Sequence, residues 1–140
     1  MQVLSRMEEY IKQEGVKPSD EAWLIVDRDQ WDEKHLDLLH QWTLKCSNYK
    51  LALSNPKFEF WLLLHYEDAK NISTERECLT RLKHYLPNYN KKIEVRKITH
   101  TQIHNAVYRA EQRDKPPCPS WPRSFGSTTV YRLVRKILKN

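Results

Sequence analysis

The chain has 140 residues, of which 39% are hydrophobic and 30% charged, and its formal net charge is +6. This length suits one globular domain with a single modest core. The longest apolar run, residues 58–66, is interrupted by Glu59 and His65 and is too short to cross a bilayer, and the first residues do not form a secretory leader. These features argue against a membrane protein and predict a soluble, cytoplasmic one.

Positive charge is concentrated near the C-terminus. Residues 91–140 contain twelve Lys or Arg and three Asp or Glu, whereas residues 1–90 contain twelve and fifteen. Many nucleic-acid-binding proteins have such a basic region, because neutralising phosphates supplies much of the non-specific affinity. A basic surface that only faces solvent explains the distribution equally well.

The N-terminal half has the pattern of an α/β layer, in which amphipathic stretches alternate with short apolar runs. Gly15 stands where the C-terminal cap of the first helix belongs. The predicted elements are a helix over residues 3–14, a buried strand over residues 23–26, a helix over residues 31–46 and a second buried strand over residues 51–53.

The next helix is predicted from its start signal. Asn55 can cap free amides, and Pro56 suits the first helical position, where a missing N–H costs nothing. The helix over residues 57–66 is apolar nearly all round, so it must be buried.

The C-terminal half is predicted to be mostly helical. Thr74 and Glu77 have the spacing of a capping box, and Leu79, Leu82 and Leu86 follow on one helix face. Further elements are a loop or short strand over residues 91–98, a helix through Ile103, Val107 and Ala110 that ends at Pro116-Pro117, and a loop over residues 118–123 that pins Trp121 to the body.

The last predicted helix is the most strongly amphipathic. Its expected buried stripe is Val130, Leu133, Val134, Ile137 and Leu138, and its cations are expected to face solvent or a ligand.

Two carboxylates follow the first predicted strand. Asp27 and Asp29 are two residues apart, and side chains at positions i and i+2 of an extended chain point to the same side. At the carboxyl end of a parallel strand, such a pair can hold Mg²⁺ or Mn²⁺. Alternatively, one aspartate caps the following helix and the other faces solvent.

Glu59 is the only acidic residue in an otherwise apolar helix. Burying a carboxylate without a partner is costly or forces protonation. A metal ion, an arginine or the amides at the helix N-terminus should therefore hold it, and the last two would explain Glu59 without any function.

Three segments together resemble the RloB family, and they cover most of the chain in order. They are Trp23-Leu24-Ile25-Val26-Asp27-Arg28-Asp29, Leu51-Ala52-Leu53-Ser54-Asn55-Pro56-Lys57-Phe58-Glu59-Phe60-Trp61-Leu62-Leu63-Leu64-His65 and Ser127-Thr128-Thr129-Val130-Tyr131-Arg132-Leu133-Val134.

The resemblance implies a Toprim-like fold, a divalent-metal site and membership of phage-defence or restriction-associated systems, including abortive infection, often beside an ATPase. Carried over, the family's Asp-x-Asp motif falls on Asp27 and Asp29, and its Asn-Pro-x-Phe-Glu motif falls on Asn55, Pro56, Phe58 and Glu59.

The sequence departs from the family at its start. Members begin with a strand that ends in a Cys-Glu-Gly-like turn, whose glutamate completes the acidic centre, followed by a second strand; neither is found here. We therefore expect one truncated Toprim-like three-layer α/β domain over residues 1–140. Residues 1–66 are expected to keep about two parallel strands, and residues 67–140 to form a helical, basic part.

Two functions are consistent with these features. The first is Mg²⁺- or Mn²⁺-dependent cleavage of nucleic acid, in which Asp27 and Asp29 bind the metal, Glu59 completes the catalytic set, and the substrate is held by Arg28, Lys57, Arg132, Arg135 and Lys136. The second is a non-catalytic module that binds nucleic acid or an ATPase subunit. A strand over residues 23–26 without its outer neighbour should also expose an edge, which predicts a homodimer or, without a partner, a tendency to aggregate.

Overall fold

The computed structural model describes residues 2–139, which form a mixed α/β fold. Within these residues six α-helices accompany one three-stranded sheet. The elements are α1 Gln2–Glu14, β1 Ala22–Asp27, the 3₁₀ helix η1 Arg28–Gln30, α2 Glu33–Thr43, β2 Tyr49–Asn55, α3 Phe58–Leu63, α4 Glu75–Tyr85, the 3₁₀ helix η2 Val95–Lys97, α5 His100–Arg113, β3 Ser127–Thr128 and α6 Val130–Lys139.

The sheet has the strand order β1-β2-β3. β1 and β2 are parallel, as predicted, and their register places Asp27 opposite Ser54. The sequence analysis missed β3, which runs antiparallel to β2 and places Thr128 opposite Ser54. The sheet is therefore a parallel pair extended by a two-residue antiparallel strand, because the C-terminal part returns to the centre of the fold.

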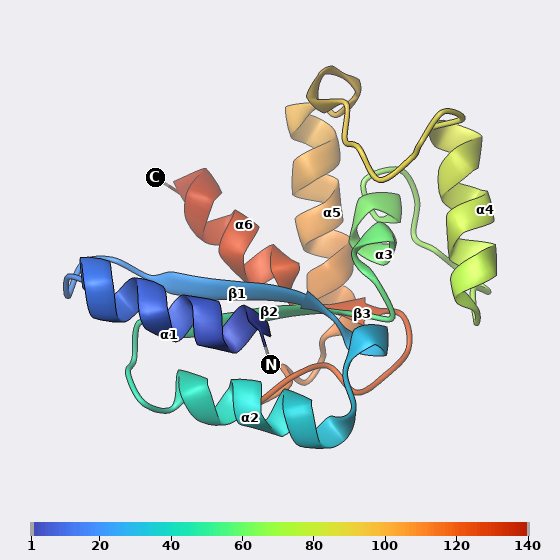
Figure 1. Ribbon diagram of the computed structural model, residues 1–140. Helices are drawn as coiled ribbons and strands as arrows, with labels where there is room; N and C mark the ends of the chain where they lie inside the picture. Colours follow the sequence, from blue (N-terminus) through green and yellow to red (C-terminus); the bar gives the residue numbers. More distant parts are fainter. Residues whose placement is uncertain (1, 140) are drawn as a thin grey trace.

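Helices cover both faces of the sheet, so the expected three-layer arrangement is confirmed (Figure 1). α1 and α2 lie on one face, α3, α5 and α6 on the other, and α4 packs outside α3. Each face has its own apolar cluster. Leu24, Leu36, Leu53 and Trp121 belong to the α2 side, and Ala52, Phe60 and Leu63 to the opposite side.

β1 is an edge strand with one well-covered face. Leu24 and Val26 are buried against the α2 layer, whereas Ile25, which points to the other face, is 51% exposed. Within residues 2–139 no strand pairs with the outer edge of β1. Asp27 ends this strand, so the tertiary structure puts the first candidate residue at the carboxyl end of a parallel strand.

Several local predictions are confirmed. α1 ends at Glu14, and Gly15 adopts a φ of +74°, as a C-terminal cap requires. The side chain of Thr74 accepts a hydrogen bond from the Glu77 N–H at the start of α4. Trp121 is 2% exposed, so the loop does hold this tryptophan in the core.

The predicted helix start at Asn55 and Pro56 is wrong. Asn55 is the last residue of β2, and its Nδ2 donates to the Pro122 carbonyl at 3.1 Å. Asn55 therefore ties the sheet to the loop near Trp121. α3 begins at Phe58 and ends at Leu63, shorter than predicted, although the turn after it is also buried.

Two apolar positions expected on the packed faces of their helices are exposed instead. Leu79 is 36% exposed, and α4 packs through Cys78 and Leu82 instead. Ile137 is 61% exposed near the end of α6. The helix predicted over residues 31–46 is the shorter α2, Glu33–Thr43. It starts at Glu33 because the Asp32 side chain caps its N-terminus by accepting a hydrogen bond from the His35 N–H.

Candidate functional site

Asp27 is held where β1 meets the connection between β2 and α3. Its Oδ1 accepts a hydrogen bond from the Phe58 N–H at 3.0 Å. The side chain is partly buried. Because β1 and β2 are parallel neighbours, their carboxyl ends bring Asp27 beside the first turn of α3. The Asn-Pro-x-Phe-Glu motif thus contributes the amide that orients the first aspartate.

Asp29 reaches the same region by a different route from the one expected. The extended chain ends at Asp27 and turns into η1, so the alternation argument for positions i and i+2 is wrong. The Asp29 N–H donates to the Pro56 carbonyl at 3.3 Å, and its carboxylate lies 3.4 Å from Lys57 Nζ. Lys57 also lies 3.2 Å from Glu75, so it links η1 to α4.

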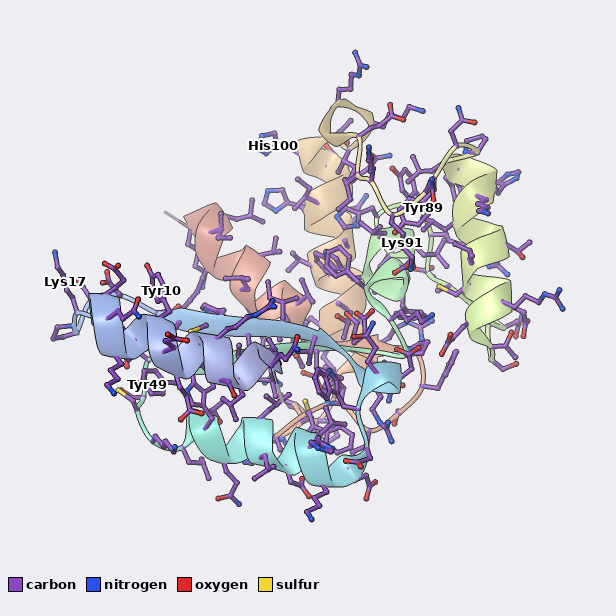
Figure 2. The ribbon with its side chains drawn as sticks, viewed as in Figure 1. Tyr10, Lys17, Tyr49, Tyr89, Lys91 and His100 are labelled. Carbon is purple, nitrogen blue, oxygen red and sulfur yellow. The ribbon has the colours of Figure 1, made fainter. Side chains whose placement is uncertain are left out.

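Glu59 is buried in the first turn of α3, with 9% of its side chain exposed. As predicted, it has a partner, but this is Lys91, whose Nζ donates to Glu59 Oε1. Lys91 belongs to the irregular connection between α4 and α5, and Figure 2 labels it close to Tyr89 at the top of α3. A buried acid is therefore neutralised from outside by a lysine whose side chain is 68% exposed.

The acidic residues of this region affect the pKa of Asp27 and of Tyr89. Burial raises the pKa of Asp27; the Phe58 N–H lowers it, and Glu59 and Asp29 raise it again. Burial, followed by Glu59 and Asp27, raises the pKa of Tyr89 to about 12. Tyr89 is therefore a neutral hydroxyl at the edge of an acidic cluster at neutral pH.

A pocket of about 320 Å³ adjoins this cluster between α3, α4 and the Lys91 segment. Glu59 lines it together with three cations, Lys57, Arg76 and Lys91. The apolar part of its wall includes Cys78, and burial raises the pKa of this thiol to about 12, so the thiol is protonated at neutral pH. The pocket offers positive charge beside negative charge, the combination that a metal-bound phosphodiester requires.

The donor set fits a hard divalent cation that keeps much of its water. Among residues 2–139, no three His, Cys, Asp or Glu side chains are gathered so as to enclose a metal ion by themselves. Mg²⁺ commonly uses one or two carboxylates, with water and substrate phosphate completing its shell. Asp27 and Asp29 suit this chemistry, and Glu59 would join them only by leaving Lys91.

Arg28 does not face this cluster. Its Nη1 donates to the Trp31 carbonyl at 2.7 Å, and its guanidinium lies 5.6 Å from the ring centre of Trp121. Of the five cations predicted to hold nucleic acid, Lys57 alone is placed beside the acidic residues.

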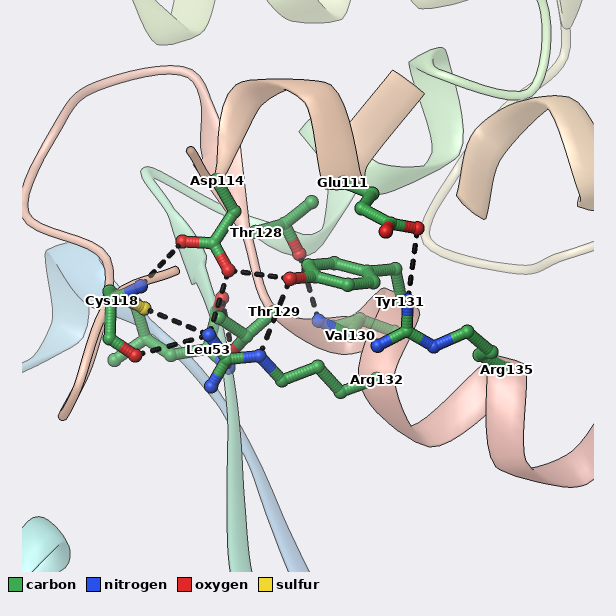
Figure 3. Close-up of polar contacts among 10 residues, drawn as sticks. All are labelled: Leu53, Glu111, Asp114, Cys118, Thr128, Thr129, Val130, Tyr131, Arg132 and Arg135. Atoms are coloured by element: carbon green, nitrogen blue, oxygen red, sulfur yellow. Dashed lines mark hydrogen bonds and ion pairs between the residues drawn. The ribbon is translucent and has the colours of Figure 1, made fainter. Parts of the chain in front are cut away.

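The remaining three predicted cations lie on α6 and already have carboxylate partners. Arg132 is 2.7 Å from the buried Asp114, which also accepts from the Tyr131 hydroxyl (Figure 3). Arg135 is 2.9 Å from Glu111, and Lys136 pairs with Glu21 just before β1. The expectation that Arg132 faces solvent is wrong, because its side chain is used to lock α6 to the end of α5.

The C-terminal end of α6 lies far from the acidic cluster, at the other end of β1. Lys136 contacts Glu21 just before β1, whereas Asp27 ends that strand. A six-residue strand is roughly 20 Å long. A single bound phosphate cannot contact both places, so any substrate that uses both must be an extended polymer.

Sequence reasoning missed Lys91, Arg76 and Tyr89. No local pattern distinguishes Lys91 from its neighbour Lys92, since both are exposed lysines in a segment without periodicity. The available signal was indirect: a buried Glu59 needed a cation, and the basic segment that begins at residue 91 is rich in candidates.

The chain belongs to the RloB-like protein family, whose model matches residues 1–137. No curated protein and no solved structure matches the chain. The expected family is therefore confirmed over nearly the whole length, including the segments that carry Asp27, Asp29 and Glu59.

No helix among residues 2–139 is both long and apolar enough to cross a membrane.

Proposed function

We propose that this RloB-like protein is a metal-dependent enzyme that cleaves phosphodiester bonds of nucleic acid in a cytoplasmic phage-defence or restriction-associated system. The observation that carries the proposal is the placing of Asp27 and Asp29 against the connection between β2 and α3, close to the buried Glu59 and to a pocket lined by cations. Family membership supports it, because all three residues fall within the matched segment. On this proposal the sheet belongs to a Toprim-like fold.

The proposed division of labour is based on the contacts. Asp27 and Asp29 bind Mg²⁺ or Mn²⁺, which when present would polarise a phosphoryl oxygen and lower the pKa of bound water. The Phe58 N–H fixes the orientation of Asp27. Lys57 and Arg76, which line the adjoining pocket, hold the substrate backbone.

Cleavage assays with the whole protein test this proposal. DNA and RNA are incubated separately with Mg²⁺ and with Mn²⁺, using wild type, Asp27→Asn and Asp29→Asn. Each substitution is expected to lower the cleavage rate by more than about 100-fold, because it removes a metal ligand. Glu33→Gln, an exposed acid at the start of α2, is the matched control. Absence of metal-dependent cleavage by wild type, or full activity of both variants, would contradict the proposal.

A non-catalytic binding or assembly role is the second candidate, and the open edge of β1 favours it. The Ala22 N–H donates to the Asn48 carbonyl at 2.9 Å, so alternate residues of β1 turn their backbone toward β2. The backbone groups of Trp23 and Ile25 then point outward, and they make no hydrogen bond within residues 2–139.

A groove of about 1310 Å³ runs along this edge, bounded by α1, β1 and α6. Two exposed apolar side chains line this groove, Tyr10 on α1 (Figure 2) and Ile137 on α6. Unpaired strand edges pair with other strands unless they are covered. In this second candidate function, β1 of a second copy pairs with the open edge. The resulting homodimer then has a continuous surface that binds nucleic acid or an ATPase subunit.

A further inference from the structure

The contact between Glu59 and Lys91 joins two side chains in very different surroundings. The Glu59 side chain is 9% exposed, whereas that of Lys91 is 68% exposed. Lys91 Nζ is the one hydrogen-bond partner found for the Glu59 carboxylate within residues 2–139. Because the lysine is anchored only through a flexible, solvated chain, it can leave without disturbing the core, while the acid cannot move far.

The other cations at the pocket are differently bound. Lys57 lies between Asp29 and Glu75, so losing either partner leaves it paired with the other. Arg76 lies in the first turn of α4 and lines the pocket without an ion pair among the described residues. Lys91 alone neutralises one buried acid and also borders the space where a substrate would sit.

The entry of a divalent cation would change the charge balance of this cluster. A metal ion bound by Asp27 and Asp29 repels Lys91 and attracts the Glu59 carboxylate. Lys91 then needs a new anionic partner close by, and a phosphate in the adjoining pocket provides one. The same pocket wall carries Lys57 and Arg76, which suit a phosphodiester but not a neutral ligand.

We propose that Lys91 is an exchangeable counter-ion. It pairs with the Glu59 carboxylate in the free protein, and it moves to a substrate phosphate when Glu59 binds a divalent metal ion. This inference rests on the proposed function, because it assigns a role at the same site. It makes Lys91 a competitor of the metal before substrate binds and a substrate contact afterwards, so metal and nucleic acid bind cooperatively.

Opposite effects of one substitution test the inference. Mn²⁺ affinity is measured by electron paramagnetic resonance of the free ion in the absence of nucleic acid. Lys91→Gln is expected to bind Mn²⁺ about tenfold more tightly than wild type, which corresponds to about 1.4 kcal/mol. Single-turnover cleavage by the same variant is expected to fall at least tenfold, because glutamine carries no charge to pair with the substrate phosphate.

The control and the double variant make the result specific. Lys92→Gln removes the same charge from the adjacent exposed residue, and both quantities should stay within twofold of wild type. In a Glu59→Gln background, Lys91→Gln should no longer tighten Mn²⁺ binding, because the competition is already absent. Circular dichroism verifies that each variant is folded.

The outcomes separate this inference from the proposed function. If wild type binds Mn²⁺ and cleaves, but Lys91→Gln binds the ion no more tightly than Lys92→Gln, the exchange is overturned and the enzymatic proposal stands. If neither wild type nor Lys91→Gln binds Mn²⁺, both are overturned. If Lys91→Gln alone binds the ion, competition by Lys91 is supported directly.

Discussion

Two buried acids in this protein are held in opposite ways. Asp114 accepts from the Tyr131 hydroxyl at 2.6 Å, from Arg132 at 2.7 Å and from the Cys118 N–H at 3.0 Å. Among the described residues, the Glu59 carboxylate is paired with one exposed lysine, Lys91. A carboxylate that accepts three hydrogen bonds from the fold contributes to stability, whereas one neutralised by a removable cation remains available to a ligand.

The same contrast extends to the regions around the two acids. At the junction of α5, residues 114–123 and α6, polar groups and the guanidinium of Arg132 are matched within the chain (Figure 3). Around β1, Ile25 is exposed and the outer strand edge is open. The first region is expected to respond to substitution through unfolding, and the second through binding.

Removing the buried charge at the junction is expected to have the largest effect. Asp114→Asn leaves Arg132 without its counter-ion and should lower the free energy of unfolding by about 3 kcal/mol, measured by urea denaturation. Glu111→Gln breaks the more exposed pair with Arg135 and should cost less than about 1 kcal/mol. Equal losses in the two variants would remove the distinction between the regions.

The pH dependence of unfolding also tests the role of Asp114. Burial raises the pKa of Asp114, but hydrogen bonds from Tyr131, Cys118 and Arg132 outweigh burial and hold it below the ordinary value of 3.8. A lowered folded-state pKa contributes stability above the unfolded-state pKa, and that contribution disappears as the pH falls through the folded-state value. Wild type should therefore lose stability below about pH 4 more steeply than Asp114→Asn.

Charging the open edge tests whether β1 associates. Ile25→Lys should weaken a homodimer by about 100-fold or more, because it places two like charges across the shared edge, while unfolding of the monomer should change little. Sedimentation velocity over a wide concentration range measures the effect. Leu38→Lys is the matched control, since Leu38 is 47% exposed on α2 and lies in the opposite layer. A wild-type protein that stays monomeric at every concentration contradicts pairing through β1.

The cations on the outer face of α6 are paired with carboxylates, and they contribute to nucleic-acid binding only if phosphates displace those partners. Arg135→Gln with Lys136→Gln should then reduce affinity and lower the salt slope of binding by about 1 for each phosphate that is no longer neutralised. Arg132 is omitted because its removal unlocks Asp114. Lys34→Gln, exposed on α2, should leave the slope unchanged. An unchanged slope in the α6 variant would show that Glu111 and Glu21 fully occupy these cations.

A small gain in stability is expected at the candidate site. Because the folded-state pKa of Asp27 is raised, chiefly by burial, its contribution to stability falls as the pH rises from 3.8 through the folded-state value. Asp27→Asn keeps an oxygen for the Phe58 N–H and should stabilise the protein at pH 7 by about 0.5 kcal/mol, as for like-charge neighbours. Asp29→Asn should give no gain, since it loses the ion pair with Lys57. Thermal unfolding of both variants and of wild type at pH 7 measures these differences in stability.

Much of the local structure was predictable from neighbouring residues. The cap at Gly15, the helix start at Thr74 and the strand over residues 23–26 depend on interactions within a few positions, and the structure has all three. The same reasoning misread Asn55, because its tertiary hydrogen bond to Pro122 spans 67 positions. A side chain that suits a local cap can instead form a hydrogen bond with a distant segment, and the neighbouring residues give no sign of such a contact.

The sequence by itself determined the family, the α/β layering, and the placing of Asp27 after a strand and of Glu59 in a helix, because motif and hydrophobic period are carried by consecutive residues. Only the tertiary structure decided which charges meet. Lys91 contacts Glu59 across 32 positions, and Arg132 contacts Asp114 across 18. Such pairs form because packing brings their elements together, so equivalent lysines and arginines in the sequence acquire different roles according to the burial of the acid that each one reaches.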